Sequence, residues 1–119
     1  MSKHFPITIY HNPKCGTSRN TLAMIREAGF EPKVVDYLSE GWKRDELQAL
    51  IADMGATARD VLRARGTPAG ELGLLDEQVR EDAIVDAMLI NPILVERPIV
   101  RTPKGVKLCR PVETVKDLL

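Results

Sequence analysis

The chain has 119 residues, of which 44% are hydrophobic and 29% charged, and its 17 basic and 17 acidic side chains give a formal net charge of zero. This length fits one domain with a core of its own, and the neutral balance argues against a general binder of nucleic acid or membrane surfaces. No apolar run is long enough for a membrane span, and the residues up to Pro6 lack the apolar region of a signal peptide. Two cysteines, Cys15 and Cys109, are too few for a disulfide scaffold, so we expect a reducing, cytoplasmic setting.

The first part of the chain predicts a strand, a helix and a second strand. A β-branched run at residues 7–10 predicts the first strand, and a helix is expected over residues 16–28 with Leu22, Ile25 and Ala28 on its buried face. The second strand is expected over residues 33–37. In this order the two strands should be parallel, with a right-handed crossover.

The middle of the chain is predicted to be helical. Two stretches carry apolar residues at helical spacing, namely Leu47, Leu50, Ile51 and Met54, and then Val79, Ala83, Ala87 and Met88. Between these stretches, Thr57 and Asp60 form a capping pair that predicts the start of a short helix.

The last part of the chain predicts a hairpin and a closing helix. Residues 98–100 and 106–109 are expected to be strands joined by a turn at 102–105, and Pro111 suits the first turn of the closing helix. That helix carries Val112, Val115 and Leu118. The element order therefore predicts an α/β domain with a small mixed sheet and helices on its faces.

Cys15 stands where the first helix should begin, after a turn that contains Pro13. The free N–H groups and the dipole at a helix N-terminus favour a thiolate, so Cys15 is predicted to be reactive rather than a buried structural cysteine. The same N–H groups can bind an oxyanion. His11 could lower the thiol pKa as an imidazolium or through a hydrogen bond, or it could be an exposed loop histidine.

The residues that follow Cys15 exclude two kinds of chemistry. Ser18 stands where the second cysteine of a Cys-x-x-Cys pair would be, so the site has one thiol and a second thiol must come from elsewhere. Thr21 stands where the phosphate loop of a tyrosine phosphatase needs an arginine. The spacing of the cysteines and histidines also matches no zinc pattern, so no metal is expected.

Three arginines are candidates for binding an oxyanion: Arg63, Arg97 and Arg110. Among 17 basic residues, each could also be an ordinary surface arginine. Pro98 opens a strand and could follow a cis peptide bond, although most bonds before proline are trans. Cys109 alternates with its neighbours in a strand, which favours burial over a role as a second, resolving thiol.

Four segments of the chain resemble the glutaredoxin-coupled arsenate reductases of the thioredoxin-like superfamily. In order, they are His11-Asn12-Pro13-Lys14-Cys15-Gly16-Thr17-Ser18-Arg19-Asn20-Thr21-Leu22, Val61-Leu62-Arg63, residues 91–100 and Leu108-Cys109-Arg110-Pro111. The resemblance implies a thioredoxin-like α/β fold over residues 1–119, as a single domain with a small mixed four-stranded sheet. It also implies a helical insertion, at about residues 43–91, between the second and third strands.

The resemblance also implies an activity and a role for each matched residue. Cys15 would attack arsenate, with His11 keeping it ionised and Ser18 bonded to its sulfur. Arg63, Arg97 and Arg110 would bind the substrate, and Pro98 would be the cis-proline of the fold. With no tightly bound cofactor, glutathione would serve as co-substrate and form a mixed disulfide with the cysteine, and glutaredoxin would resolve it as arsenite is released.

Two other functions stay open from the sequence. One is a thiol protein of the same fold that acts on another oxyanion or thiol substrate, since the arginines do not distinguish arsenate from similar anions. The other is a redox regulator that binds RNA polymerase, against which the serine at position 18 argues.

Overall fold

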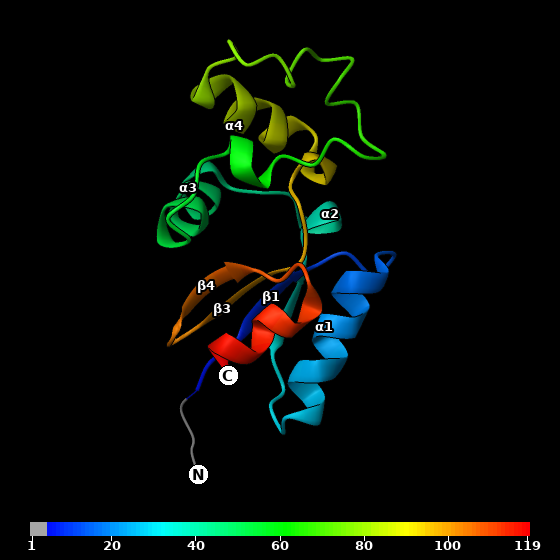
Figure 1. The fold of residues 1–119 in the computed structure, drawn as a ribbon, viewed down its shortest axis with the longest axis vertical. Coiled ribbons are helices and arrows are strands. Elements are labelled where there is room, and N and C mark those ends of the chain that lie inside the picture. Colours follow the sequence, from blue (N-terminus) through cyan, green and yellow to red (C-terminus); the bar gives the residue numbers. More distant parts are fainter. Residues whose placement is uncertain (1–4) are drawn as a thin grey trace. The chain divides into compact units, whose positions relative to one another are not determined.

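The computed structural model describes residues 5–119. They form two compact units, one made of the described residues up to Glu40 together with Arg97–Leu119, and one made of Gly41–Glu96 (Figure 1). No helix within the described part of the chain has both the length and the apolar character needed to cross a membrane. The expected insertion at about 43–91 falls inside the second unit, and the single-domain organisation stays a prediction.

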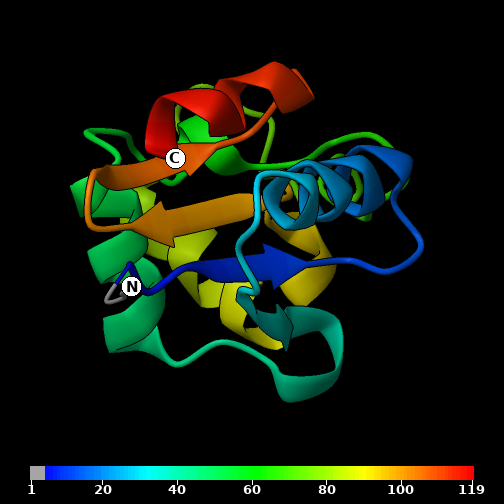
Figure 2. The same ribbon diagram turned by 90° about the horizontal axis from the view of Figure 1, so that it is seen from below.

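The first unit is built on a four-stranded sheet in the order β2-β1-β3-β4. Its strands are β1 (Thr8–His11), β2 (Lys33–Asp36), β3 (Ile99–Thr102) and β4 (Gly105–Leu108). β1 runs parallel to β2 and antiparallel to β3, and β3 and β4 form the hairpin (Figure 2). The small mixed four-stranded sheet is therefore confirmed.

The register of the sheet brings two segments that are distant in the sequence to the same end of the sheet. Tyr10, near the end of β1, pairs with Ile99, the first residue of β3. Because these strands are antiparallel, the loop that leaves β1 and the residues that enter β3 lie at one end of the sheet. The peptide bond between Arg97 and Pro98, just before β3, is cis, and so is the bond between Arg110 and Pro111.

Two helices of this unit pack against the same side of the sheet. α1 (Gly16–Glu27) and the 3-10 helix η3 (Val112–Leu118) bury apolar side chains against β1 and β3. The core cluster consists of Ile7, Ile9, Ile25, Val100, Cys109, Val115 and Leu118. The closing helix is thus a 3-10 helix, and its residues Val112, Val115 and Leu118 recur every three positions, which matches three residues per turn.

The buried face of α1 matches the prediction only in part. Ile25 is buried and Leu22 is half-buried against the core, as expected, but Ser18 and Thr21 are buried too and Ala28 is exposed. Periodicity of apolar residues could not find this face, because two of its members are polar. Burial is tolerated since their hydroxyls are paired, with Thr21 Oγ1 donating to the carbonyl of Thr17 at 2.8 Å and Ser18 bonded to the loop after β1.

β2 also ends one residue earlier than predicted, because Asp36 caps the next helix. Its carboxylate accepts the backbone N–H groups of Leu38 and Ser39, at 3.2 and 3.3 Å. Such bonds satisfy the free N–H groups of a first helical turn, so Tyr37 begins α2 (Tyr37–Glu40) instead of extending the strand.

The second unit is mainly helical. It contains α3 (Arg44–Asp53), the 3-10 helices η1 (Arg59–Val61) and η2 (Pro92–Leu94), and α4 (Glu81–Ile90). The capping pair is confirmed, since the N–H of Thr57 donates to Asp60 Oδ2 at 2.8 Å and the N–H of Asp60 donates to Thr57 Oγ1 at 3.3 Å.

The apolar faces of the two longer helices are only partly as predicted. Leu47, Leu50 and Ile51 of α3 are buried as expected, and Met54 is its half-buried C-cap. In α4 Met88 is buried as expected, but the rest of the buried face is Ile84 and Val85, with Ala83 and Ala87 only half-buried and Val79 before the helix. The larger side chains bury more apolar area than alanines, so they determine which face turns inward.

Candidate active site

Cys15 lies at the N-cap of α1, in an extended conformation with φ −97° and ψ 123°. Its carbonyl accepts the first helical hydrogen bond, from the N–H of Arg19 at 2.9 Å, and its own N–H donates to the carbonyl of Asn12 at 3.0 Å. The backbone N–H of Ser18 faces the sulfur and lowers its pKa. The predicted place of the thiol at a helix N-terminus is therefore confirmed.

Asn12 holds the loop in which Cys15 lies, a role that sequence reasoning missed. It is buried, its side-chain Oδ1 accepts the N–H of Lys14 at 2.9 Å, and its own N–H donates to Ser18 Oγ at 3.1 Å. With the bond to Cys15, these contacts tie the loop both to itself and to α1. The available signal was an Asn followed by Pro, because Asn side chains often accept the N–H two residues on.

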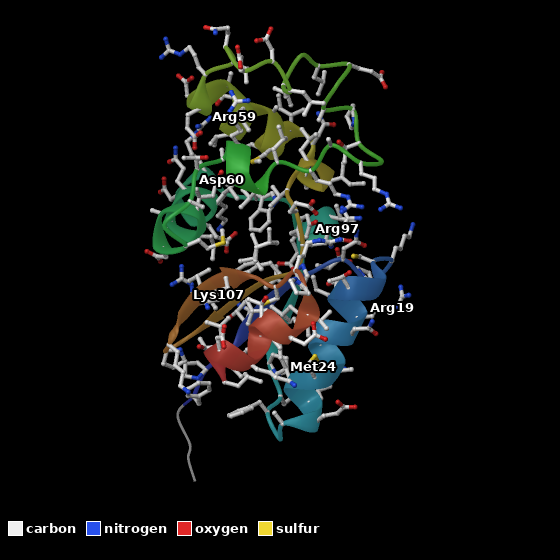
Figure 3. All side chains as sticks on the ribbon, in the orientation of Figure 1. Arg19, Met24, Arg59, Asp60, Arg97 and Lys107 are labelled. Carbon is white, nitrogen blue, oxygen red and sulfur yellow. The ribbon has the colours of Figure 1, made fainter. Side chains whose placement is uncertain are left out.

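Two of the three candidate arginines lie beside the sulfur. Arg110 Nη1 is 3.9 Å from Cys15 Sγ and also donates to the carbonyl of Arg97 at 2.9 Å. Arg97 is only 8% exposed, and its Nε and Nη1 atoms have no hydrogen-bond partner among the described residues. Figure 3 labels Arg97 near the N-terminal end of α1. A buried cation with unused donors is costly alone and suits a site that receives an anion.

The surroundings of Cys15 lower its thiol pKa to about 7, from an ordinary value of 9.0. Partial burial acts in the opposite direction, because it disfavours the charged form. The N–H of Ser18 and the guanidinium groups of Arg97 and Arg110 outweigh this penalty by stabilising the thiolate. About half of the Cys15 thiol is then ionised near neutral pH.

His11 is the buried last residue of β1, so it is not an exposed loop histidine. Its Nδ1 lies 2.5 Å from Ser18 Oγ. Burial is the main cause that lowers its pKa, partly opposed by Asp36, so the neutral imidazole is favoured near pH 7. This environment favours hydrogen bonding over an imidazolium charge, and the ring contacts the hydroxyl of Ser18, whose backbone N–H faces the sulfur.

Arg63 belongs to the second unit and has partners of its own. Its Nη1 forms an ion pair with Glu96 Oε1 at 2.9 Å, and its Nε donates to the carbonyl of Arg65 at 2.9 Å. Both side chains of the pair are largely buried, 13% and 22% exposed. Glu96, a residue that sequence reasoning missed, immediately precedes Arg97. The predicted role of Arg63 in binding substrate stays a prediction.

Cys109 is fully buried in the core cluster, as predicted. Burial raises its thiol pKa to about 12, and its Sγ lies 3.7 Å from the carbonyl of Lys107. A thiol that stays protonated and is shielded from solvent is a poor nucleophile, so the structure argues against a resolving role. Within residues 5–119 no group of three or more His, Cys, Asp or Glu side chains could hold a metal ion.

The chain is similar to known proteins over most of its length. The model of the ArsC family matches residues 10–118. An arsenate reductase from Rhizobium meliloti (strain 1021) is 57% identical over 113 residues, which cover 95% of this chain and 81% of that protein. An arsenate reductase from Escherichia coli is 58% identical over 113 residues, covering 95% of this chain and 80% of that protein.

A solved structure extends the comparison to the fold. The arsenate reductase from Vibrio cholerae superposes with a TM-score of 0.92 at 37% identity, covering 98% of this chain and all 100% of that one. This match confirms the expected thioredoxin-like α/β fold. By its family match and by the identity and coverage of these relatives, the chain belongs to the ArsC family.

Proposed function

We propose that this chain is an arsenate reductase in which the thiolate of Cys15 is the nucleophile. The observation that carries the proposal is a thiol with a pKa of about 7 beside a buried arginine that has unused donors. Relatives at 57% and 58% identity that are named arsenate reductases support the choice of substrate.

The first step is attack of the Cys15 thiolate on As(V). A sulfur–arsenic bond forms, an arsenic–oxygen bond breaks, and the oxygen leaves as water once it is protonated. Arsenate is an anion that repels a thiolate, so Arg97 and Arg110 act by neutralising it. Arg63 is proposed to bind the same anion. Ser18 donates its backbone N–H to the thiolate, and His11 holds the hydroxyl of Ser18.

The second step needs a thiol from outside, because the loop has one cysteine and Cys109 is buried. Glutathione attacks the sulfur of Cys15, and the sulfur–arsenic bond breaks with its electron pair moving to arsenic. This releases arsenite, As(III), and leaves a Cys15–glutathione disulfide. Glutaredoxin then attacks the glutathione sulfur and frees Cys15. No resident cofactor takes part, and the need for glutathione fits the reducing, cytoplasmic setting predicted above.

The test is arsenite formation by purified protein with arsenate, glutathione and glutaredoxin. We expect turnover that disappears in Cys15→Ser and persists in Cys109→Ser, which is the matched control because it removes the other thiol. Absence of arsenate-dependent turnover in the wild-type protein would reject the substrate. Oxidation of glutathione with thiosulfate in place of arsenate tests the alternative of another oxyanion.

A further inference from the structure

The first unit carries a cavity beside α1 whose lining residues, apart from His11, have no part in the proposed reaction. Its volume is about 520 Å³, and its lining includes Pro13 of the Cys15 loop and Arg19, Leu22, Arg26 and Glu27 of α1. Arg19, Leu22 and Arg26 follow one another at intervals of three and four, so they form one stripe, with Glu27 beside Arg26. The cavity therefore runs from the nucleophile loop along the helix.

The end of this cavity at Pro13 adjoins the loop of the reactive cysteine. Arg19 Nη1 donates to the carbonyl of Pro13 at 3.0 Å, and a Cβ placed on Gly16 would lie 3.8 Å from Arg19 Nη2. The guanidinium group of Arg19 thus lies against the residues that flank Cys15. Figure 3 shows Arg19 beside the first half of α1.

The charges along the cavity are two cations and one carboxylate. Arg19 has one bonded nitrogen, and its Nε and Nη2 have no partner among the described residues. Arg26 is paired with Glu31 through Nε and Nη2, which leaves its Nη1 without a partner in the same part of the chain. That pair is exposed and therefore weak enough to rearrange around a ligand. Glu27 supplies the negative charge beside Arg26.

We propose that this cavity binds glutathione and presents its thiol to Cys15. Glutathione carries two carboxylates and one ammonium group, which complement Arg19, Arg26 and Glu27. Arg19 and Arg26 are seven residues apart, or about 10 Å along a helix, and an extended tripeptide spans about 10 Å. The apolar floor at Leu22 accommodates the chain between its charged ends. This inference rests on the proposed function in one respect, namely that the reaction needs a thiol from outside the protein.

Thiol–disulfide exchange tests the site without arsenate. Cys15 is first converted to a mixed disulfide with thionitrobenzoate, in a Cys109→Ala background so that one thiol reacts. An incoming thiolate then attacks the Cys15 sulfur, and the disulfide breaks to release the coloured thionitrobenzoate thiolate. The measured quantity is the ratio of the second-order rate constants for glutathione and for uncharged 2-mercaptoethanol.

We expect Arg19→Gln and Arg26→Gln each to lower this ratio by up to about fivefold, and the double variant by about tenfold or more. Glutathione diethyl ester, which lacks the carboxylates, should lose the advantage on the unsubstituted protein. Arg80→Gln is the matched control, because Arg80 is an exposed arginine of the second unit.

A ratio unchanged in both single variants and in the double variant would overturn the proposal. An equal slowing of both thiols would also overturn it, because that result would mean that Arg19 only shapes the loop. Failure of the arsenate assay alongside a lowered ratio would instead reject the proposed substrate and support the glutathione site.

Discussion

The two cysteines of this chain lie in one unit and have opposite environments. Cys15 stands at the beginning of a helix, with an N–H group and two guanidinium groups near its sulfur, and its pKa falls to about 7. Cys109 lies among apolar side chains, and its pKa rises to about 12. The comparison shows that the surroundings, not the residue type, make a thiol reactive, since burial acts against the charged form at both positions.

The largest expected effect is in alkylation of the native protein. At pH 7 we expect iodoacetamide to modify Cys15 faster than Cys109 by on the order of 1,000-fold, because the thiolate is the reactive form and Cys109 is both protonated and shielded. Mass spectrometry of peptides after short exposures measures the two rates. Equal labelling of both cysteines in the folded protein would contradict the predicted difference in their reactivity.

A smaller loss should follow from removing Arg97, which supplies the buried donors beside Cys15. Losing a charged contact in a desolvated site costs about 2–3 kcal/mol, so Arg97→Ala should lower kcat/KM for arsenate at least about 30-fold. It should also raise the Cys15 pKa, measured by the pH dependence of alkylation. The control is Lys107→Ala, which removes an exposed cation from β4. Near-normal values for Arg97→Ala would exclude it from the site.

The pH dependence should separate the cysteines further. Below pH 7 the alkylation rate of Cys15 should fall about tenfold per pH unit, and above that value it should level off. Because its pKa is depressed on folding, Cys15 adds stability above its ordinary value of 9.0, and this contribution is lost as pH falls through about 7. Cys109 has the opposite sign, so its contribution is lost as pH rises above 9.0 toward 12. A Cys15 rate that climbs steadily to pH 9 would contradict this assignment.

The smallest effect on turnover is expected at Cys109. Cys109→Ser should keep kcat within about twofold while lowering the free energy of unfolding by about 1–3 kcal/mol, because a hydroxyl is buried among apolar groups. Urea unfolding followed by circular dichroism measures this loss, and Cys109→Ala separates the polar penalty from the lost volume. A large drop in turnover with stability unchanged would show that Cys109 takes part in the chemistry.

Much of the first unit could be predicted from local sequence. The strand, the Pro-containing turn and the helix place Cys15 at an N-terminus because each is set by residues next to it in the chain. The hairpin of β3 and β4 could be predicted for the same reason. The predicted buried face of α1 missed Ser18 and Thr21, because the burial of a hydroxyl depends on partners, such as His11, that periodicity does not reveal.

Contacts between distant segments were beyond the sequence pattern. Arg110 reaches Cys15 across 95 positions, and only the pairing of β1 with β3 and of β3 with β4 brings them together. The unused donors of Arg97 and the ion pair of Arg63 with Glu96 likewise depend on side-chain geometry. The family resemblance named the arginines, but it did not distinguish a guanidinium with unused donors from one in an ion pair.

The turn of the hairpin between β3 and β4 is a suitable place for an insertion. Its turn pairs Thr102 with Gly105 at the end of the sheet opposite the Arg97–Pro98 bond, and Pro103 and Lys104 at its tip are exposed. Extra residues inserted between them would lengthen the tip without shifting the strand register. A fluorescent reporter or an affinity tag could therefore be grafted there, away from the sulfur, to follow mixed-disulfide formation in real time.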